Sequence, residues 1–436
     1  MLPLSGFVII DASSVLMGPY ASQWLGDLGA RVIKVEPPAG DSTRQTGPST
    51  EAGMGAVFMG TNRNKQSVVI DLKKPAGQQA LQALLSQADA FMHSIRPQKL
   101  AAIGLEPETL RQRYPKLIFA TLHGFTEQGP YGGRPAYDDI IQGMSGMADL
   151  ARLQGQDPAY FPTASADKTS GLIAAIAILG ALLARQRDGQ GRQVEVPMFE
   201  SMVSFNLVEH LYGMHFEPAL APAGYPRVTN PWRRPYPSAD GHVCMMPYTD
   251  AHWQRFFRAC GRDDWADDPR FASMAERTRH IGDLYSALGQ LVAAEPTAHW
   301  LALCEQLDIP AAAVTPLQGL PQDPHLQATD FFQTLDDPVM GRIRLTGVPV
   351  LFDGQRPAVQ MPPRLGQHTR MALLAAGVSE EQIQLWLAEG AIAPWAKSTS
   401  PYYNQTLEAL GKHYKFRLDD RWDDLSKAAQ KAILFG

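Results

Sequence analysis

The sequence has few of the residues and motifs that mark many protein classes. Only three cysteines occur among its 436 residues, Cys244, Cys260 and Cys304. Their spacing matches no paired metal-binding motif, and their small, odd number is typical of a protein kept in a reducing compartment. The N-terminus lacks the basic region and long apolar segment of a secretory signal peptide. We therefore expect a cytoplasmic protein, and no metal site.

Nucleotide-binding motifs are also missing. The first predicted strand is followed by Ser13-Ser-Val-Leu-Met-Gly18-Pro-Tyr, which is not the Gly-x-Gly-x-x-Gly fingerprint of dinucleotide-binding enzymes. No Walker-type phosphate loop or zincin helix is present. These absences argue against an NAD-dependent enzyme, a P-loop NTPase and a zinc protease.

Positive charge and long apolar runs are limited as well. The formal net charge is -5, which argues against nucleic acid or an anionic membrane as the main partner. The longest run without charge, residues 169–184, is shorter than the roughly 20 residues that a membrane-spanning helix needs. We expect this run to form a helix buried on all sides, and we expect no membrane partner.

The first third of the chain alternates between strand and helix patterns. Residues 7–11 and 31–36 are predicted strands, and residues 20–28 between them have helical periodicity. The same alternation predicts strands at 67–71, 90–92 and 117–122, with helices at 77–87 and 107–113. Repeated βαβ units imply an α/β fold with a doubly wound parallel sheet.

The length of the chain exceeds what one hydrophobic core usually supports. Proline and glycine are frequent from residue 218 to 237, which indicates a linker. We expect a large domain from residues 1–215 and 321–395, a linker at 216–239, a smaller α+β domain at 240–320, and an appended helical tail at 396–436.

A carboxylate, Asp167, precedes the apolar helix and has no His or Cys close to it in sequence. Aspartate is a favoured helix N-cap, and the local pattern by itself favours that structural role. The alternative role is that of a nucleophile. The two roles are compatible, because the amide donors and the positive end of a helix dipole would keep a capping carboxylate ionised.

Several motifs, in order along residues 1–395, resemble the family III CoA-transferases of the CaiB/BaiF type. This family contains formyl-CoA:oxalate and carnitine CoA-transferases and, as relatives, α-methylacyl-CoA racemases. The matching segments are residues 18–36, Gly40-Asp41 with Arg44, 62–65, 124–125 with 129–131, 136–138 with Gln142 and 145–146, 161–198, 240–241, Trp253, 268–271, Arg277, Trp300, 309–310 and 365–369.

The resemblance implies that Asp167 is a nucleophile that attacks an acyl-CoA thioester and forms first an anhydride and then an aspartyl-CoA thioester. A second carboxylic acid would then receive the CoA. Coenzyme A is thus expected as a substrate of acyl-CoA metabolism, with no tightly bound cofactor. The resemblance also implies a Rossmann-like large domain that binds CoA, and an interlocked, ring-like homodimer.

The racemase branch of the family is the alternative enzyme. Its proton exchange uses a histidine at the position that Tyr137 occupies here, and a neutral phenol is a poor base at pH 7. His123 could replace that base, although a structural role is favoured for it, and His368 is also expected to be structural.

The CoA contacts that the resemblance implies are spread over several loops. They are Leu16, Met17, Ile70, Lys73, Ser94, Ile95, Arg96, Tyr137 and Asp138. Lys73 and Arg96 are suited to the phosphates of CoA. The chain departs from the oxalate enzyme at Pro37, Ala102 and Pro135, and it lacks that enzyme's glycine-rich loop, so oxalate is not the expected acceptor. Arg233 and Arg234 could pair with an acceptor carboxylate, although linker arginines are usually solvated.

From about Lys397 the sequence instead resembles a short segment of the bacterial excision-repair damage-recognition ATPase. Helical periodicity predicts two short helices, at residues 402–413 and 425–434. We interpret this tail as a peripheral extension without a nucleic-acid partner. It also motivates a non-enzymatic alternative, in which the chain is a CoA-binding or docking module.

Overall fold

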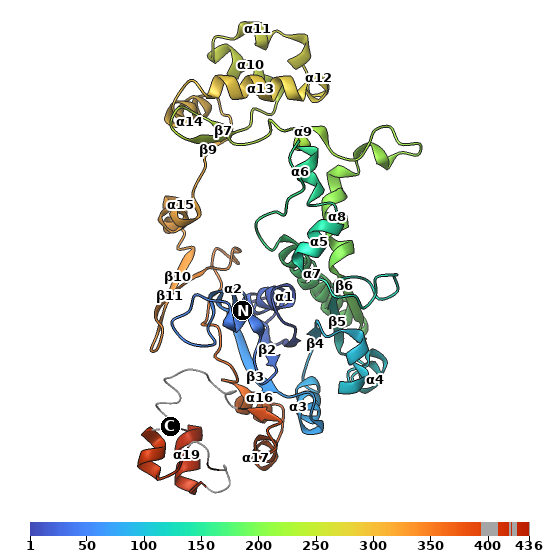
Figure 1. Cartoon of the computed structure of the whole chain (residues 1–436), viewed down its shortest axis with the longest axis vertical. Helices are drawn as coiled ribbons and strands as arrows, with labels where there is room; N and C mark the ends of the chain where they lie inside the picture. Colours follow the sequence, from blue (N-terminus) through green and yellow to red (C-terminus); the bar gives the residue numbers. More distant parts are fainter. Residues whose placement is uncertain (394–408, 418–419, 421–424, 436) are drawn as a thin grey trace. The chain divides into compact units, whose positions relative to one another are not determined.

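The computed structural model describes residues 1–393, 409–417, 420 and 425–435. The chain divides into two compact units, and Figure 1 labels many of the elements of both. The first unit comprises residues 1–141, 163–201 and 329–436, and the second comprises residues 142–162 and 202–328. Two helices, α5 (Asp138–Met144) and α8 (Met198–His210), begin in the first unit and end in the second.

The first unit is built on a seven-stranded sheet with the order β12-β3-β2-β1-β4-β5-β6. Its strands are β1 (Val8–Ala12), β2 (Arg31–Glu36), β3 (Lys65–Ile70), β4 (Ala90–His93), β5 (Ile118–His123), β6 (Gln193–Pro197) and β12 (Ile392–Ala393). The predicted α/β alternation and the parallel pairing of β1 to β6 are confirmed. The sheet is nevertheless mixed, because β12 pairs antiparallel with β3. A strand of two residues is too short to show strand periodicity, so the sequence did not predict β12 at this edge of the sheet.

The two faces of the sheet differ because side chains alternate along each strand. On one face Ile10, Ile33 and Val68 pack in an apolar cluster with residues of α3, α4, α16 and α17. The opposite face carries Asp11 and Lys34 beside α1. The helices of this unit are α1 (Met17–Asp27), α2 (Ala56–Thr61), α3 (Pro75–Leu85), α4 (Pro107–Arg113), α7 (Ser165–Asp188), α16 (Thr369–Ala375) and α17 (Glu380–Ala388).

Shorter elements complete the first unit. A separate antiparallel hairpin is formed by β10 (Phe332–Asp337) and β11 (Gly341–Thr346). Single 3₁₀ turns are η1 (Ser42–Gln45), η2 (Pro97–Lys99) and η3 (Ala101–Ile103). In the tail, residues 409–414 are helical and α19 spans Lys427–Phe435, which confirms the second predicted tail helix. Residues 402–408 of the first predicted tail helix lie outside the described residues.

The long apolar helix α7 is not buried on all sides, so that prediction was wrong. Leu172, Ile176 and Leu183 are exposed, and the exposed fraction of Ile176 is 68%. These residues are spaced by four and seven positions and therefore form one stripe of the helix. By length and composition alone α7 could cross a membrane, which is weak evidence because helices in protein cores pass the same test.

The second unit has its own sheet and its own core. An antiparallel sheet of order β7-β8-β9 packs with aromatic residues such as Trp253, Phe256 and Trp300. Its strands are β7 (Tyr236–Pro237), β8 (His242–Met245) and β9 (Ala311–Ala313). Its helices are α6 (Asp149–Leu153), α9 (Pro226–Thr229), α10 (Asp250–Ala259), α11 (Asp263–Ala266), α12 (Met274–Arg279), α13 (Ile281–Val292), α14 (Thr297–Gln306) and α15 (Pro324–Ala328), with 3₁₀ turns η4 (Tyr212–His215), η5 (Pro269–Phe271) and η6 (Leu317–Gln322).

Helices α1 and α7 approach each other closely at Gly171. A Cβ atom at Gly171 would lie 2.7 Å from the Met17 carbonyl oxygen, which belongs to the backbone and cannot move away cheaply. We predict that Gly171→Ala lowers the free energy of unfolding by about 1–3 kcal/mol, measured by urea denaturation. Gly180→Ala in the same helix is the control, because a Cβ there meets nothing within 4 Å. Equal stability of the two variants would contradict this account of the packing.

Candidate functional site

The strand order reverses between β1 and β4, and the loops that follow these two strands lie next to each other. The Ser14 N–H donates a hydrogen bond of 3.3 Å to Ser94 Oγ. Ligands of open α/β sheets commonly bind at such a reversal, outside the carboxyl ends of the strands. The structure thus brings the two predicted groups Leu16–Met17 and Ser94–Arg96 to one edge of the sheet.

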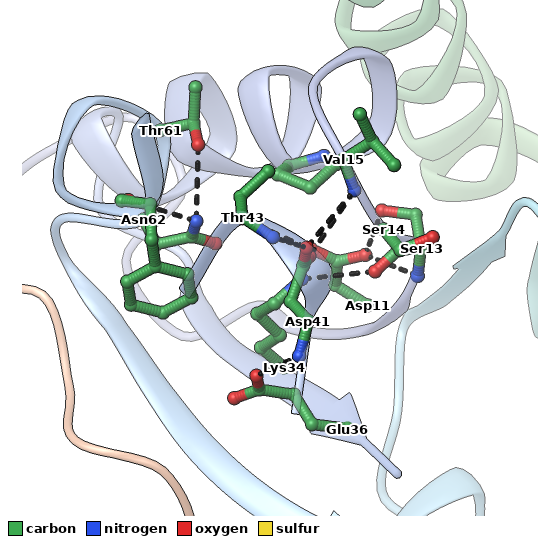
Figure 2. Close-up of polar contacts among 12 residues, drawn as sticks. Asp11, Ser13, Ser14, Val15, Lys34, Glu36, Asp41, Thr43, Thr61 and Asn62 are labelled. Carbon is green, nitrogen blue, oxygen red and sulfur yellow. Dashed lines mark hydrogen bonds and ion pairs between the residues drawn. The ribbon is translucent and has the colours of Figure 1, made fainter. Parts of the chain in front are cut away.

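The loop after β1 is held from below by buried charges (Figure 2). Lys34 Nζ lies 2.9 Å from Asp41 Oδ2 and donates a 3.0 Å hydrogen bond to the Ser13 carbonyl. Asp11, at the end of β1, accepts hydrogen bonds from the Ser13 N–H and from the Ser22 hydroxyl. All of these side chains are buried. The loop backbone is therefore fixed by side chains that come from β1, α1 and β2, and from the loop after β2.

Val15 in this loop has a backbone conformation that side chains with a branched Cβ rarely adopt. Its φ is 70°, in the left-handed region. Such a residue costs roughly 1–3 kcal/mol and persists only where its surroundings impose it. The Val15 N–H donates to both carboxylate oxygens of Asp41 at 3.3 Å, and Asp41 also accepts a 3.0 Å bond from the Thr43 N–H. Asp41 thus joins the strained residue to the buried cation Lys34, as Figure 2 shows.

Two further cations balance the buried acids on this face of the sheet. Arg44 binds Glu36 with a closest distance of 2.7 Å, and Lys65 Nζ lies 3.5 Å from Asp11 Oδ2. Burial would raise the pKa of Asp11, but the charges of Lys34 and Lys65 hold this pKa below its usual value. Burial lowers the pKa of Lys65 to about 7. Apart from Asp11, these residues lie in the segments that resemble the family, but the sequence gave no sign that they meet.

Asp167 lies in the first turn of α7 and is not its N-cap. The helix begins at Ser165 after Ala164, whose side chain makes no capping hydrogen bond. The capping role that the local pattern by itself favoured is therefore wrong. The Asp167 N–H instead donates a 2.9 Å bond to Oδ1 of Asp138, at the start of α5. Asp138 thus positions the backbone of Asp167, and both are predicted site residues.

Burial, and to a smaller extent the negative charge of Asp138, together raise the pKa of Asp167 to about 7. This corrects the expectation that helix amides keep the carboxylate ionised, because a carboxylate that is partly buried beside a second acid is destabilised as an anion. In the ligand-free chain, proton binding to Asp167 is therefore balanced near neutral pH. Perturbed carboxyl groups of this kind are common in active sites.

The other predicted contact residues differ in exposure. Tyr137 is 70% exposed and directly precedes Asp138, and Lys73 and Arg96 are also exposed. Ile70 and Met17 are buried residues, so neither presents its side chain to a ligand in the ligand-free chain. The strand that carries Ile70 is separated from β1 by β2, although both strands end at the same edge.

Three histidines lie near the predicted residues. His123 Nε2 shares a 3.1 Å hydrogen bond with the Ile95 carbonyl, and its Nδ1 lies 3.0 Å from Glu127. His123, Glu127 and Glu195 form a group whose imidazole nitrogen and carboxylate oxygens lie within 4.8 Å of one another. The sequence missed His93, which is buried under the β4 loop and accepts a 3.1 Å bond from the Ile95 N–H. His368 accepts a 3.2 Å bond from the Ser67 N–H, as expected of a structural residue.

Comparison with known proteins decides the family. The model of CoA-transferase family III matches residues 4–369. The chain belongs to the family III CoA-transferases. The succinate–glutarate CoA-transferase of Agrobacterium fabrum is 32% identical over 85% of this chain and 95% of its own length. The formyl-CoA:oxalate CoA-transferase of Escherichia coli is 26% identical over 87% of this chain and 97% of its own length.

Solved structures agree with this CoA-transferase assignment. The crystal structure of Rv3272 from Mycobacterium tuberculosis has a TM-score of 0.73 and 29% identity, covering 85% of this chain and 99% of that one. A CaiB/BaiF family protein from Brucella suis has a TM-score of 0.72 and 27% identity, covering 86% of this chain and 99% of that one. The protein is therefore an enzyme of acyl-CoA metabolism.

The end of this CoA-transferase chain matches a second family. The model of the UvrA DNA-binding domain matches residues 381–436, which confirms the resemblance seen in the sequence. The match begins inside α17, whose Ile383 and Trp386 pack in the apolar cluster of the main sheet. The first part of the matched segment therefore belongs structurally to the CoA-transferase unit.

We predict that Asp41→Asn destabilises the protein by about 3 kcal/mol, because it leaves Lys34 short of a buried counter-charge. Urea denaturation measures the change. Glu380→Gln is the control, since it breaks an exposed pair with Arg370 in the same unit, and such pairs contribute little. If Asp41→Asn were as stable as Glu380→Gln, the buried pair would not support the loop.

Proposed function

We propose that this enzyme moves CoA from an acyl-CoA thioester to a free carboxylic acid, with Asp167 as the nucleophile. The observation that carries this proposal is a partly buried carboxylate at the start of α7, held by Asp138 and having a pKa of about 7. A carboxylate that ionises near neutral pH is more nucleophilic than an ordinary one and needs no imidazole to deprotonate it.

The reaction proceeds by four exchanges at carbonyl carbons. Asp167 attacks the acyl carbon of the donor thioester and the C–S bond breaks. CoA departs as a thiolate, and a mixed anhydride between Asp167 and the donor acid is formed. The thiolate attacks the Asp167 carbonyl carbon, which releases the donor acid and forms an aspartyl-CoA thioester. The acceptor carboxylate attacks that thioester, which forms a second mixed anhydride and releases the thiolate again. The thiolate then attacks the acceptor's acyl carbon in this anhydride. The new acyl-CoA departs, and Asp167 is again a carboxylate.

Binding of CoA is proposed at the edge where the β1 and β4 loops meet. Exposed Arg96 is available to the phosphates of CoA, while the backbone of Leu16 and Met17 lies at the N-terminus of α1, where amide groups favour an anion. Lys73 is proposed as a second phosphate contact. The charges beneath Val15 keep this loop in one conformation before the ligand arrives, which lowers the entropy cost of binding.

We further propose a cytoplasmic homodimer, interlocked as in the family. The exposed apolar stripe of α7 supports an assembly, because water-exposed Leu172, Ile176 and Leu183 are unfavourable in a lone chain. Phe205 and Val208 on α8 are exposed as well.

The direct test of the nucleophile uses Asp167→Ala and Asp167→Asn. We predict that both variants lose at least about 10³-fold in CoA transfer from succinyl-CoA or acetyl-CoA to a panel of acids, because no group remains to carry the acyl intermediate. Hydroxylamine should trap a CoA-dependent adduct on Asp167 of the wild type, located by peptide mass spectrometry. Full turnover by either variant would sink the proposal, and α-proton exchange without transfer would favour a racemase.

The pH dependence gives an independent test of the site. The nucleophile must be ionised, so the rate of CoA release in a single turnover should rise with pH around a midpoint near 7. Asp138→Asn retains an oxygen acceptor for the Asp167 N–H but removes the negative charge. The pKa of Asp167 should then fall, and the midpoint should move to lower pH.

The matched control for this shift is Asp139→Asn. Asp139 is the next residue of α5 and is exposed, and it is not among the causes of the shifted pKa of Asp167. Its substitution should leave the midpoint unchanged. An equal shift in both variants would mean that general surface charge, rather than Asp138, sets the pKa.

A further inference from the structure

The β6 edge of the main sheet carries a group of side chains that the proposed chemistry does not use. β5 and β6 pair in parallel with Thr121 opposite Glu195, so His123 and Glu195 lie on the same face of the sheet (Figure 1). Glu127 follows β5 in a turn, and its backbone N–H donates a 2.7 Å hydrogen bond to Glu195 Oε1. One imidazole nitrogen and two carboxylates are thus brought within 4.8 Å of one another.

The two ring nitrogens of His123 have different surroundings. Nε2 lies 3.1 Å from the Ile95 carbonyl oxygen, which can only accept, so Nε2 carries a hydrogen and donates it. In a neutral ring Nδ1 is then a bare lone pair. Nδ1 is buried and makes no hydrogen bond, the His123 side chain is only 8% exposed, and Glu127 Oε1 lies 3.0 Å away. A lone pair and a carboxylate repel each other unless a positive charge joins them.

This arrangement is the one that metal-binding histidines have. A histidine that binds a metal through one nitrogen usually donates its other N–H to a backbone carbonyl or a carboxylate, which fixes the tautomer and the orientation of the ring. His123 makes such a bond to Ile95. In the part of the chain that the structure describes, no Lys or Arg lies within ion-pair distance of Glu127 or Glu195. The group is therefore oriented for a cation that the protein's own side chains do not supply.

We propose that His123 Nδ1, Glu127 and Glu195 bind one divalent transition-metal ion of the Zn²⁺ type. One nitrogen with two carboxylate oxygens suits Zn²⁺, whereas Mg²⁺ and Ca²⁺ prefer oxygen ligands alone. Three protein ligands leave a position for water, and the exposed Glu127 gives the ion a route from solvent. The expectation of no metal site rested on the spacing of the cysteines, which does not detect a site made by folding from His and Glu.

The ion has a structural role, because it holds the loop after β4. Ile95 in this loop is bound by two histidines: its N–H donates a 3.1 Å hydrogen bond to His93 Nδ1, and its carbonyl accepts from His123 Nε2. The same loop meets the β1 loop through the hydrogen bond between Ser14 and Ser94. A metal on Nδ1 fixes the His123 ring and makes its N–H a stronger, charge-assisted donor.

The binding test uses untagged protein that a chelator has stripped of metal. The wild type should bind one Co²⁺ per chain, seen by the visible absorption of the bound ion, and Zn²⁺ should displace it. In the Glu127→Gln/Glu195→Gln variant the dissociation constant for Zn²⁺, measured by calorimetry, should rise at least about tenfold, since changes outside the ligands alone cost about 10–100-fold. Glutamine at position 195 keeps an oxygen acceptor for the backbone hydrogen bond, and Glu127→Gln alone is the second variant if the double variant does not fold.

Glu108→Gln is the matched control, because Glu108 is an exposed glutamate of α4, in the same unit and outside the group. It should bind Zn²⁺ as the wild type does. Equal affinity of the wild type and the double variant would overturn the proposal, and metal bound at the exposed Cys244 would give that result. Tighter binding of Ca²⁺ than of Zn²⁺ would overturn the assignment of the ion.

Hydrogen exchange followed by peptide mass spectrometry tests the link to the β4 loop. Zn²⁺ should slow amide exchange of residues 94–96 in the wild type and leave it unchanged in the double variant. Tightly bound Zn²⁺ without slower exchange in this loop would contradict the structural role. Neither measurement uses CoA transfer, so failure of this site and failure of the proposed function are separate results.

Discussion

The ion pair between Lys34 and Asp41 is the interaction on which the sheet edge depends. Both side chains are buried, so neither charge can be left alone without a large desolvation cost. Lys34 reaches the carbonyl of Ser13, and Asp41 reaches the N–H of Val15. The pair therefore fixes both ends of the turn after β1. That turn starts α1, against which α7 packs through Gly171.

The charge environment of Asp167 is opposite to that of the buried acids near the β1 loop. Asp11, Glu36 and Asp41 each face a buried cation, whereas Asp167 faces another carboxylate, Asp138. Neighbouring cations lower a carboxyl pKa, and a neighbouring anion raises it. The same fold thus keeps its structural acids ionised and leaves one acid near its midpoint at neutral pH. In the proposed mechanism this acid carries the acyl group.

The elements that the sequence predicted well are those set by local periodicity. Strands β1, β2, β4 and β5 lie within a residue or so of their predicted bounds, because alternating or continuous β-branched runs are visible in a short window. The two features that the sequence did not predict, β12 and the exposed stripe of α7, depend on contacts with distant segments. β12 exists because β3 offers it hydrogen bonds, and the exposed stripe of α7 reflects which neighbours the helix has, which no local window contains.

The sequence by itself determined the α/β class, the family motifs and the identity of the acid at the start of α7. The tertiary structure alone decided that Asp167 is not a cap, that Asp138 lies against it, and that Val15 is held in a left-handed conformation. It also placed Arg233 and Arg234 at an open pocket in the second unit, and among the described residues neither pairs with an acidic side chain. Residue type and spacing encode which groups are present, but burial and charge proximity depend on segments far apart in the chain. A pKa or a binding cavity arises only when folding brings those segments together.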